Sequence, residues 1–558
     1  MAQVTVESID ADVSVFPKET VALTVNSEIV LAGELLQYKA YVQDASQENN
    51  TLSKVCYVSL RNQQDSTVFS HKLKVEEGTA NGDYFLPSNL KTGVYKLVGY
   101  TNFSKNNSID AFAQKDLYII NTFHKYKPDG RAENTITLTA IAKNDPVLRD
   151  DIVSEEIDIL LNKKRFGPRE KVNLRLSAAS NNATGNYCLS VRKINPVEIA
   201  GKTQKAIKAN TPHKFYVPEI RGMLLSGLVV SKANGNPAPN IEVALTIPGE
   251  NFNFKIAKTN ADGRFFFSVA EDFDSERSIM QLYGDQTTRN DYQLVLDEKK
   301  LNLAEYGPSV LKLDSGLKSW LQERSVQLQI ENAYFEIKQD HFLKEEAARP
   351  FYNDLGTVYN LDDYTRFSTV RETFIEIIDL AAIRGKGEKA KFVVNNPYDP
   401  EGLAKFNAID PLVLMDGMLI QDNEELIGFN AREIERIRVI NEPYRYGPKV
   451  FSGIIAIETK KGNYIPKIAH DYVSEINVQP LERKKRYYRP DYDNNTSLSR
   501  IPDYRVQLMW EPNVKIASEE LPTAFFASDV SGTYEISVAG FNTAGRYIFA
   551  KTYFEVAE

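Results

Sequence analysis

The sequence is poor in cysteine, tryptophan, methionine and histidine. Its 558 residues include two Cys, two Trp, six Met and five His. A disulfide framework or a cysteine-based metal site needs more cysteines, in closer spacing. Cys56 in KVCYVSL and Cys188 in NYCLSV lie among β-forming residues, which indicates buried strand residues that act as small hydrophobes. A disulfide between them stays an alternative in an oxidising compartment, although they fall in ranges that we interpret as separate domains.

Long apolar runs and an excess of one charge are also missing. No apolar run approaches the roughly 20 residues that a membrane-spanning helix needs. The opening residues, MAQVTVESID, lack the basic and apolar segments of a secretory signal, so no signal peptide is expected in this sequence. The 67 basic and 75 acidic residues give a formal charge of -8. This balance argues against a general nucleic-acid binder, which needs a basic surface to displace counterions.

Catalytic and metal-binding motifs are lacking as well. No histidine has a second metal ligand at a suitable spacing: His71, His124, His213, His341 and His470. There is no nucleophile elbow and no phosphate-binding loop before a helix. The acidic stretches 148–153, 361–364 and 528–532 lack the D-x-D-x-D-G spacing of a calcium loop. We therefore expect no enzyme, no metal and no cofactor.

What the sequence does have is aromatic residues and short alternating segments. Its 29 Tyr and 28 Phe suit half-buried strands, because flat side chains pack well on a pleated surface. The length predicts about three to five domains of roughly 150 residues. We predict a chain that is mainly β and multidomain.

Residues 1–123 and 124–215 each predict an antiparallel sandwich. In the first range, alternating segments recur about every ten residues, with glycine turns of positive φ expected at 81–83 and 91–93. LPSNLKTGVYKLVGYTNF resembles the closing strands of a macroglobulin-like (MG2) domain. RFGPREKVNLRLSA and GNYCLSVRK resemble the opening and middle strands of a second macroglobulin-like sandwich, and NTITLTAIAKNDPVLRDD predicts an extra strand and loop.

Residues 216–310 combine strands with Gly, Pro and Asn turns. NGNPAPN predicts a loop, and Asp262-Gly263 before an aromatic strand is a hairpin signal. The segment resembles the carboxypeptidase-regulatory-like module, a small transthyretin-like sandwich. The matching residues are Gly227, Val229, Gly235, Pro237, Val243, Thr259, Gly263 and Phe265.

Residues 311–470 are predicted to contain two helices followed by a small α+β domain. One helix would place on a single face Leu317, Trp320, Leu321, Val326 and Ile330. A second helix begins with a capping box of Thr369 and Glu372, carries an apolar stripe through Leu380 and Ala381, and ends at Gly385.

Residues 410–462 predict strand, turn, strand, helix and strand. PLVLMDGMLI predicts a hairpin about Asp416-Gly417, and NAREIERIRVI predicts a helix capped by Asn430 that carries Ile434 and Ile437 on one face. With the strand GIIAIETKKG, this order resembles the plug domain of TonB-dependent receptors. The matching residues are Asp416, Gly417, Ile434, Glu435, Gly453, Thr459 and Gly462. Two departures are the bulky loop NEPYRYGPKVF, where plugs have a glycine-rich run, and the lack of a TonB-box segment.

The chain after the plug-like segment is too short to form a receptor barrel. A large barrel needs about twenty-two strands of ~9–11 residues, and 96 residues follow Gly462. Residues 471–558 instead predict a C-terminal β-sandwich segment, with a tryptophan strand and a long hairpin about NTAGR. The basic and aromatic run before it is either a hydrated linker or a partner-binding surface. Its candidate residues are Arg483, Lys484, Lys485, Arg486, Tyr487 and Tyr488.

This order of modules resembles barrel-less cell-envelope proteins of Gram-negative bacteria that combine MG2, carboxypeptidase-regulatory-like and plug-like domains. The expected fold is macroglobulin- or Ig-like β-sandwiches, a transthyretin-like regulatory module and a small α+β plug-like domain. The resemblance implies a non-enzymatic protein of the periplasm, at the inner face of the outer membrane. It would bind, plug or scaffold an outer-membrane barrel or secretion translocon formed by another chain, together with other envelope proteins. The alternative is an envelope scaffold or adhesin without a gating role. No nucleic-acid partner and no transmembrane segment is expected. The plugging hypothesis requires that segment 410–462 keep an exposed face.

Overall fold

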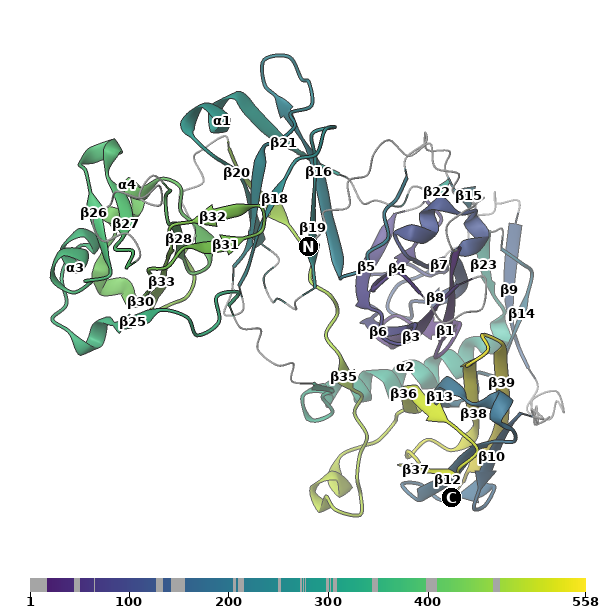
Figure 1. The fold of residues 1–558 in the computed structure, drawn as a ribbon. Coiled ribbons are helices and arrows are strands. Elements are labelled where there is room, and N and C mark those ends of the chain that lie inside the picture. Colours follow the sequence, from purple (N-terminus) through teal and green to yellow (C-terminus); the bar gives the residue numbers. More distant parts are fainter. Residues whose placement is uncertain are drawn as a thin grey trace. The chain divides into compact units, whose positions relative to one another are not determined.

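The computed structural model contains two compact units, each built from separated stretches of the chain (Figure 1). The first comprises Met1–Glu7, Arg221–Lys300 and Glu345–Leu481, and the second Ser8–Ile220, Leu301–Lys344 and Glu482–Glu558. The structure describes residues 18–44, 51–64, 66–126, 134–141, 156–203, 207–208, 215–248, 252–270, 273, 275, 277–297, 301, 303–304, 309–343, 350–397, 409–464 and 472–557. The opening stretch MAQVTVESID, His213, His470 and the acidic stretch 148–153 lie outside these residues. Strands dominate the described chain and α-helices are few, so the mainly β, multidomain prediction is confirmed.

The first sandwich of the second unit contains two sheets that enclose a core of aliphatic and aromatic side chains. One sheet has the order β1 (Glu19–Val25), β3 (Leu35–Asp44), β6 (Thr79–Phe85). The other has the order β2 (Ile29–Leu31), β8 (Ala113–Ile120), β7 (Gly93–Tyr100), β4 (Val55–Arg61), β5 (Thr67–Lys74). All pairings are antiparallel except β2 with β8, which is parallel.

The turns expected at 81–83 and 91–93 are not where the sequence predicted them. Gly82 lies inside β6 and Gly93 begins β7, and neither has positive φ. Gly82 is needed for a different reason, since a Cβ there would lie 2.7 Å from the Tyr38 Oη. A tight turn between β5 and β6 instead lies at Glu77 and Gly78. Their φ angles of 47° and 72° are the left-handed values that a two-residue turn requires.

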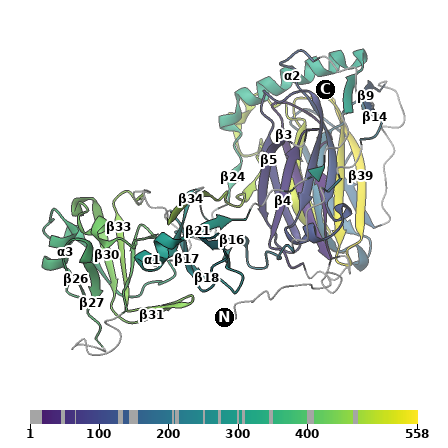
Figure 2. The same cartoon turned by 90° about the horizontal axis from the view of Figure 1, so that it is seen from above.

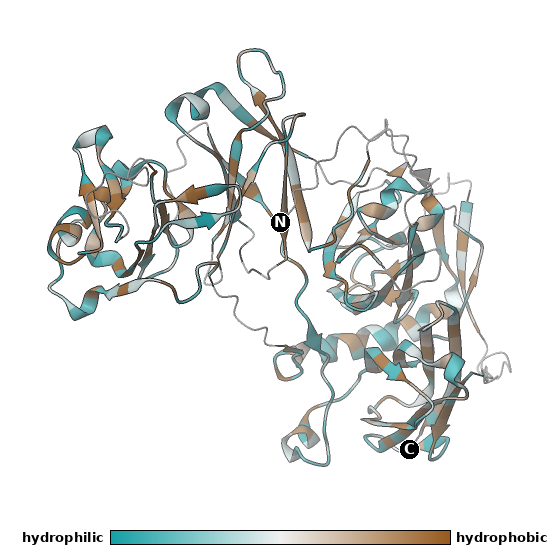
Figure 3. Cartoon of the chain, viewed as in Figure 1, coloured by the Kyte–Doolittle hydropathy of each residue, from teal (hydrophilic) through white to brown (hydrophobic). Residues whose placement is uncertain are grey.

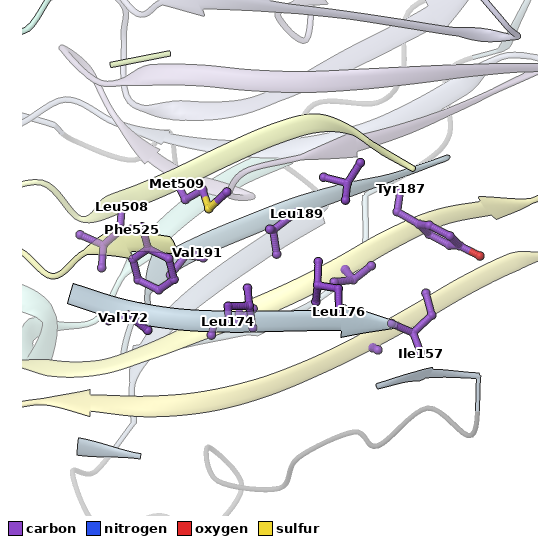
Figure 4. Packing of buried hydrophobic residues seen from close by; sticks show 14 of the residues in the cluster. Ile157, Val172, Leu174, Leu176, Tyr187, Leu189, Val191, Leu508, Met509 and Phe525 are labelled. Atoms are coloured by element: carbon purple, nitrogen blue, oxygen red, sulfur yellow. The ribbon is translucent and has the colours of Figure 1, made fainter. Parts of the chain in front are cut away.

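The second sandwich joins strands from both ends of the chain. One sheet has the order β10 (Ile157–Leu161), β12 (Lys171–Ala178), β37 (Leu521–Phe526). The other has the order β11 (Arg165–Phe166), β39 (Tyr547–Val556), β38 (Gly532–Asn542), β13 (Gly185–Lys193), β36 (Gln507–Ile516). Figure 4 shows Leu174 and Leu176 of β12 packing near Leu189 of β13. In Figure 3, hydrophobic and hydrophilic residues alternate along such strands, as the sequence KVNLRLSA of β12 requires.

The sequence assigned 124–215 and 471–558 to separate domains, and the structure combines them in this one sandwich. Strand β13 pairs with β38 along its whole length, from Gly185 opposite Asn542 to Lys193 opposite Tyr534. Half a sandwich cannot cover its own apolar face, so strands more than 300 residues apart complete each other. In Figure 2 the strands of the two sandwiches of this unit lie side by side.

A third small sheet and a helix complete the second unit. The sheet has the order β14 (Val197–Ala200), β9 (Asn134–Ala140), β23 (Ser309–Leu313), so the extra strand expected in NTITLTAIAK is present. Helix α2 (Lys318–Ala333) confirms the expected helix and part of its face, since Leu317 is buried and Trp320 and Leu321 pack on the same core. Val326 is exposed, and the buried residue within α2 is Arg324. Short pairs join β15 (Ile207–Lys208) to β22 (Leu303–Ala304) and β24 (His341–Phe342) to β35 (Lys485–Arg486).

The regulatory-like part of the first unit is also a two-sheet sandwich. Its sheets have the orders β19 (Arg264–Val269), β16 (Met223–Ser231), β21 (Tyr292–Leu296), and β18 (Asn253–Lys258), β17 (Glu242–Ile247), β20 (Arg277–Tyr283), β34 (Val473–Asn477). A short helix, α1 (Gln286–Asp291), precedes β21. Asp262 and Gly263 do form a turn, but it connects strands of opposite sheets rather than a hairpin.

Residues 350–397 and 409–464 of the first unit include the segment that resembles a plug domain and are called the plug-like part below. They form a five-stranded sheet with short helices. Its order is β25 (Thr357–Asn360), β30 (Ile434–Ile440), β33 (Ile454–Thr459), β28 (Leu412–Met415), β29 (Met418–Leu419). The other elements are α3 (Val370–Glu376), β26 (Ala381–Arg384), β27 (Lys391–Val394), α4 (Asn423–Ile427), β31 (Tyr444–Tyr446) and β32 (Lys449–Phe451). The capping box of Thr369 and Glu372 is confirmed. The helix nevertheless ends at Glu376, and the apolar residues after it continue into strand β26.

The helix predicted to carry Ile434 and Ile437 is a strand. Asn430 caps only a single 3-10 turn, Ala431–Glu433, before β30 begins. The pairing of β30 with β33 has a register shift between Ile434 and Arg436. A bulge adds a residue to one strand, so two residues three apart point to the same side, and this spacing imitates a helix.

Candidate functional site

Asp416 and Gly417 form the tight turn between β28 and β29 that the sequence predicts. Their φ angles are 47° and 78°, as a turn with two left-handed residues requires. The Asp416 carboxylate, only 6% exposed, accepts hydrogen bonds from the Thr459 N–H at 2.7 Å, the Thr459 hydroxyl at 2.6 Å and the Tyr464 N–H at 2.9 Å. Three donors compensate a buried carboxylate for lost water. This arrangement fixes the end of β33 and offers no free group for chemistry.

The other residues of the plug-like motif also have structural environments. Ile434 is fully buried, whereas Glu435 beside it is exposed. At Gly453, a Cβ would overlap the Ile440 carbonyl oxygen, so only glycine allows the two strands to approach. Gly462, with a φ of 59°, donates its N–H to the Thr459 hydroxyl at 3.1 Å. Asp416, Thr459 and Gly462 are thus joined by hydrogen bonds, and the contacts of the plug-like motif residues stabilise the fold of this segment.

One face of the plug-like sheet is covered by the helices and the hairpin of the same segment. Side chains from α3, α4, β26 and β27 pack on it, among them Phe374, Leu426 and Phe392. They enclose sheet residues such as Ile455 and Ile437, which are fully buried. This face is a closed core.

The opposite face of the sheet is covered by the regulatory-like sandwich. Leu412, Leu414 and Ala456 share a core with Phe254 of β18 and Ala244 of β17. Contact is so close that a Cβ on Gly417 would overlap the ring of Phe252. The expectation of an exposed face on 410–462 is therefore wrong for most of the sheet, because one face is a closed core and the other is covered over β28 and β29. Arg436 and Glu458, on the same side toward β25, keep side-chain exposures of 43% and 30%.

The loop NEPYRYGPKVF, which departs from the plug pattern, builds much of this interface. It forms the hairpin β31–β32 and places Tyr446 against Phe351 at 4.1 Å and Phe254 at 5.8 Å between ring centroids. The Tyr446 hydroxyl donates to the Phe254 carbonyl, and the Tyr444 hydroxyl donates to the Phe351 carbonyl at 3.0 Å. Aromatic pairs at these distances stabilise beyond the area that they bury. The bulky loop is thus explained by packing.

A polar seam completes the contact between the sheet and the sandwich. The Gln421 Nε2 donates to the Gln281 Oε1 at 3.0 Å and to the Leu282 carbonyl at 2.9 Å. The Gln281 Nε2 donates to the Leu419 carbonyl at 3.0 Å, and the Gly284 N–H donates to the Gln421 Oε1 at 3.2 Å. Buried amides that are satisfied in this way fix the register of two packed surfaces.

The basic and aromatic run that begins at Glu482 packs in part against the second unit, and its partner-binding role stays a prediction. Lys485 forms ion pairs with Asp83 and Asp340, both at 2.9 Å, and the Tyr487 hydroxyl donates to Asp83 at 3.1 Å. Lys484 pairs with Glu76.

Arg483 and Arg486 remain exposed, and the Arg483 guanidinium lies 5.0 Å from the Phe342 ring centroid. The Tyr488 N–H donates to Asp340 at 2.8 Å. Most of the six candidate residues therefore hold the second unit together.

The described chain contains no cluster of metal-binding side chains. Within it, no group of three or more His, Cys, Asp or Glu could hold a metal ion. Cys56 and Cys188 are both buried free thiols, so the disulfide alternative is wrong, and burial raises the pKa of each thiol. In the described part of the chain, no helix has the length and apolar character to cross a membrane.

Comparison with known proteins yields distant structural likeness only. No family model and no curated protein matches the sequence. A trypsin-activated alpha-2-macroglobulin from Escherichia coli aligns at 10% identity over 97% of this chain and 42% of that chain, with a TM-score of 0.25. A Salmonella alpha-2-macroglobulin reacted with methylamine aligns at 9% identity over 97% and 39%, with a TM-score of 0.24. A putative membrane anchored protein from Corynebacterium diphtheriae aligns at 10% identity over 53% and 59%, with a TM-score of 0.15. The chain thus spans less than half the length of these macroglobulins, and at such scores the alignments assign no family.

Proposed function

We propose that the protein is a non-enzymatic binding or scaffold protein of the bacterial cell envelope, in which the plug-like sheet is a fixed building block. The observation that carries this proposal is the covering of most of the sheet, on one face by its own helices and on the other by the regulatory-like sandwich. A plug closes a pore by presenting its surface to a barrel wall. A sheet that is covered over most of both faces has little surface to present, which favours the scaffold alternative over gating.

The envelope location and the partners follow from the resemblance of the modules. MG2-like, regulatory-like and plug-like segments in this order imply a periplasmic position at the inner face of the outer membrane. The partner they imply is an outer-membrane barrel or a secretion translocon, with other envelope proteins. In our proposal this partner is held beside the chain through exposed loops and edges, and it is not closed by the sheet.

Permeability of outer-membrane vesicles separates scaffold from plug. Vesicles would be prepared from cells that contain the chain, lack it, or carry the variant Gln421→Ala, which weakens the polar seam. The scaffold proposal predicts equal permeability to a small hydrophilic solute in all three, together with co-extraction of the chain and an outer-membrane protein in one complex from detergent extracts of the parent cells. Higher permeability on deletion, restored by supplying the chain, would establish a plugging role and reject the proposal.

A further inference from the structure

A polar cleft of about 320 Å³ lies between the two sandwiches of the second unit. Its floor is the outer face of β13, β38 and β39, where Ser190, Ser537 and Phe549 lie. The facing wall runs from Thr24 at the end of β1 to Glu28 before β2. The volume falls in the range of about 300–1,000 Å³ that is typical of small-molecule sites.

Arg192 brings a positive charge to this cleft. The residue lies on β13 in the cleft floor and is 9% exposed. Its Nη1 donates to the Gln507 Oε1 at 3.2 Å and its Nη2 to Glu34 at 3.4 Å, while its Nε is enclosed by protein atoms and has no acceptor among the described residues. The guanidinium is thus held in place beneath the cleft with its charge only partly compensated.

The charge around Arg192 is also unbalanced. Glu34 is already bound by both ends of the Arg324 guanidinium, each at 2.7 Å, so two arginines share one carboxylate. The other charges at the cleft largely pair with each other or with neighbours, as Lys115 does with Glu28 at 3.5 Å. One positive charge is left over in a partly desolvated place, where an anionic group would be stabilised.

The rim of the cleft offers flat apolar surface, and its walls offer hydroxyl groups. Tyr547 and Phe549 are two residues apart and lie on the same outer face of β39. Their exposed fractions are 52% and 37%. Residues two apart on a strand are about 7 Å apart, so the two rings form a short aromatic platform. Thr24 and Ser537 add hydroxyl groups that both donate and accept.

We propose that this cleft binds an acidic saccharide. Its carboxylate is attracted by the surplus positive charge of Arg192, its hydroxyls bond to Thr24 and Ser537, and the apolar face of a sugar ring packs on Tyr547 and Phe549. A peptide suits the cleft less well. The floor is a sheet face whose central strands, β13 and β38, have their backbone groups paired on both sides, so only side chains are on offer. This inference is independent of the scaffold role.

Calorimetric titration of the full chain tests the site with trigalacturonate as the probe and neutral galactotriose as the matched control. We expect one acidic trisaccharide bound per chain and at least tenfold weaker binding of the neutral one. Ser537→Trp, which fills the floor, and the double variant Tyr547→Ala/Phe549→Ala each weaken trigalacturonate binding at least tenfold. Leu160→Ala, an exposed apolar residue on the other sheet of the same sandwich, leaves it unchanged.

Four results would overturn the inference. The first three are no binding of trigalacturonate at millimolar concentration, equal binding of galactotriose, and equal binding of a Gly-Ser-Gly tripeptide, which supplies a carboxylate without a sugar. The fourth is an unchanged affinity of the Tyr547→Ala/Phe549→Ala variant for trigalacturonate. Because both rim residues are exposed, that variant keeps the fold even where Ser537→Trp does not, and a thermal midpoint within about 2 °C of the parent verifies this.

Discussion

Gln421 and Gln281 face each other across the boundary between the plug-like sheet and the regulatory-like sandwich, with the Gln421 Nε2 3.0 Å from the Gln281 Oε1. Gln421→Ala removes this bond and leaves the Leu282 carbonyl and the Gly284 N–H without their partner. Unsatisfied buried groups cost about 1–3 kcal/mol each, so the first unit should unfold at lower urea concentration. Gln329→Ala, an exposed residue of α2 that bonds only to Ser325, is the control and should change stability by less than about 0.5 kcal/mol. Equal losses of stability in Gln421→Ala and Gln329→Ala would contradict a stabilising role for the hydrogen bonds of Gln421.

Asp416 gives a second prediction, about the strength of the folding motif. Asp416→Ala removes three accepted hydrogen bonds and places alanine at positive φ, so a loss of about 2–4 kcal/mol is expected from urea unfolding. Asp416→Asn tolerates the same φ and keeps one amide oxygen, so its loss should be clearly smaller. An asparagine variant as unstable as the alanine variant would show that the carboxylate charge, and not the turn, is decisive.

Lys39 predicts an unusual dependence of stability on pH. Its ammonium group donates to the Asn186 Oδ1 at 2.7 Å, and burial lowers its pKa to about 7. Between about pH 7 and the ordinary lysine pKa, the unfolded chain binds a proton that the folded chain does not, so stability rises with pH. From pH 7.5 to 9, the free energy of unfolding should increase by about 2 kcal/mol. Lys39→Met should remove this gain in denaturant titrations, whereas the exposed Lys515→Met should keep it.

His71 predicts a loss of stability on the acid side. The Tyr38 hydroxyl lies 2.6 Å from its Nδ1, and burial together with the nearby Lys485 charge lowers its pKa to about 4. Between pH 6.5 and 4 the unfolded chain takes up a proton that the folded chain refuses, so stability falls as pH falls. His71→Gln should reduce this fall by about 2 kcal/mol between pH 6 and 4.5. NMR titration of His71 gives an independent value, and an ordinary pKa near 6.5 would contradict the buried neutral ring.

Sequence patterns identified the local structure well where it depends on neighbours in the chain. The Asp416-Gly417 turn and the Thr369 cap depend on backbone angles and side chains within a few residues, and both were predicted correctly. Ile434 and Ile437 were misassigned because a bulge reproduces helical spacing in a strand.

Relationships over long distances were not predictable from local pattern. The pairing of β13 with β38 joins residues more than 300 positions apart, and nothing near either strand specifies its partner. The covering of the plug-like sheet by the regulatory-like sandwich is not predictable for the same reason. The signal was present in the aromatic loop around Tyr446, whose bulk was noted as a departure but whose packing partner, Phe351, lies 95 residues earlier.

Thiol labelling of Ala456→Cys tests most directly the central claim that the regulatory-like sandwich covers the plug-like sheet. Ala456 lies on the face toward the regulatory-like sandwich and is 3% exposed, whereas Ile375 on α3 is 70% exposed and supplies the control Ile375→Cys. If the sandwich covers this face, a maleimide labels Ile375→Cys within seconds. It labels Ala456→Cys at least a hundredfold more slowly, at the rate at which the first unit opens. Comparable labelling rates, in a variant with the parent's unfolding midpoint, would show that this face is open and would restore the plug hypothesis.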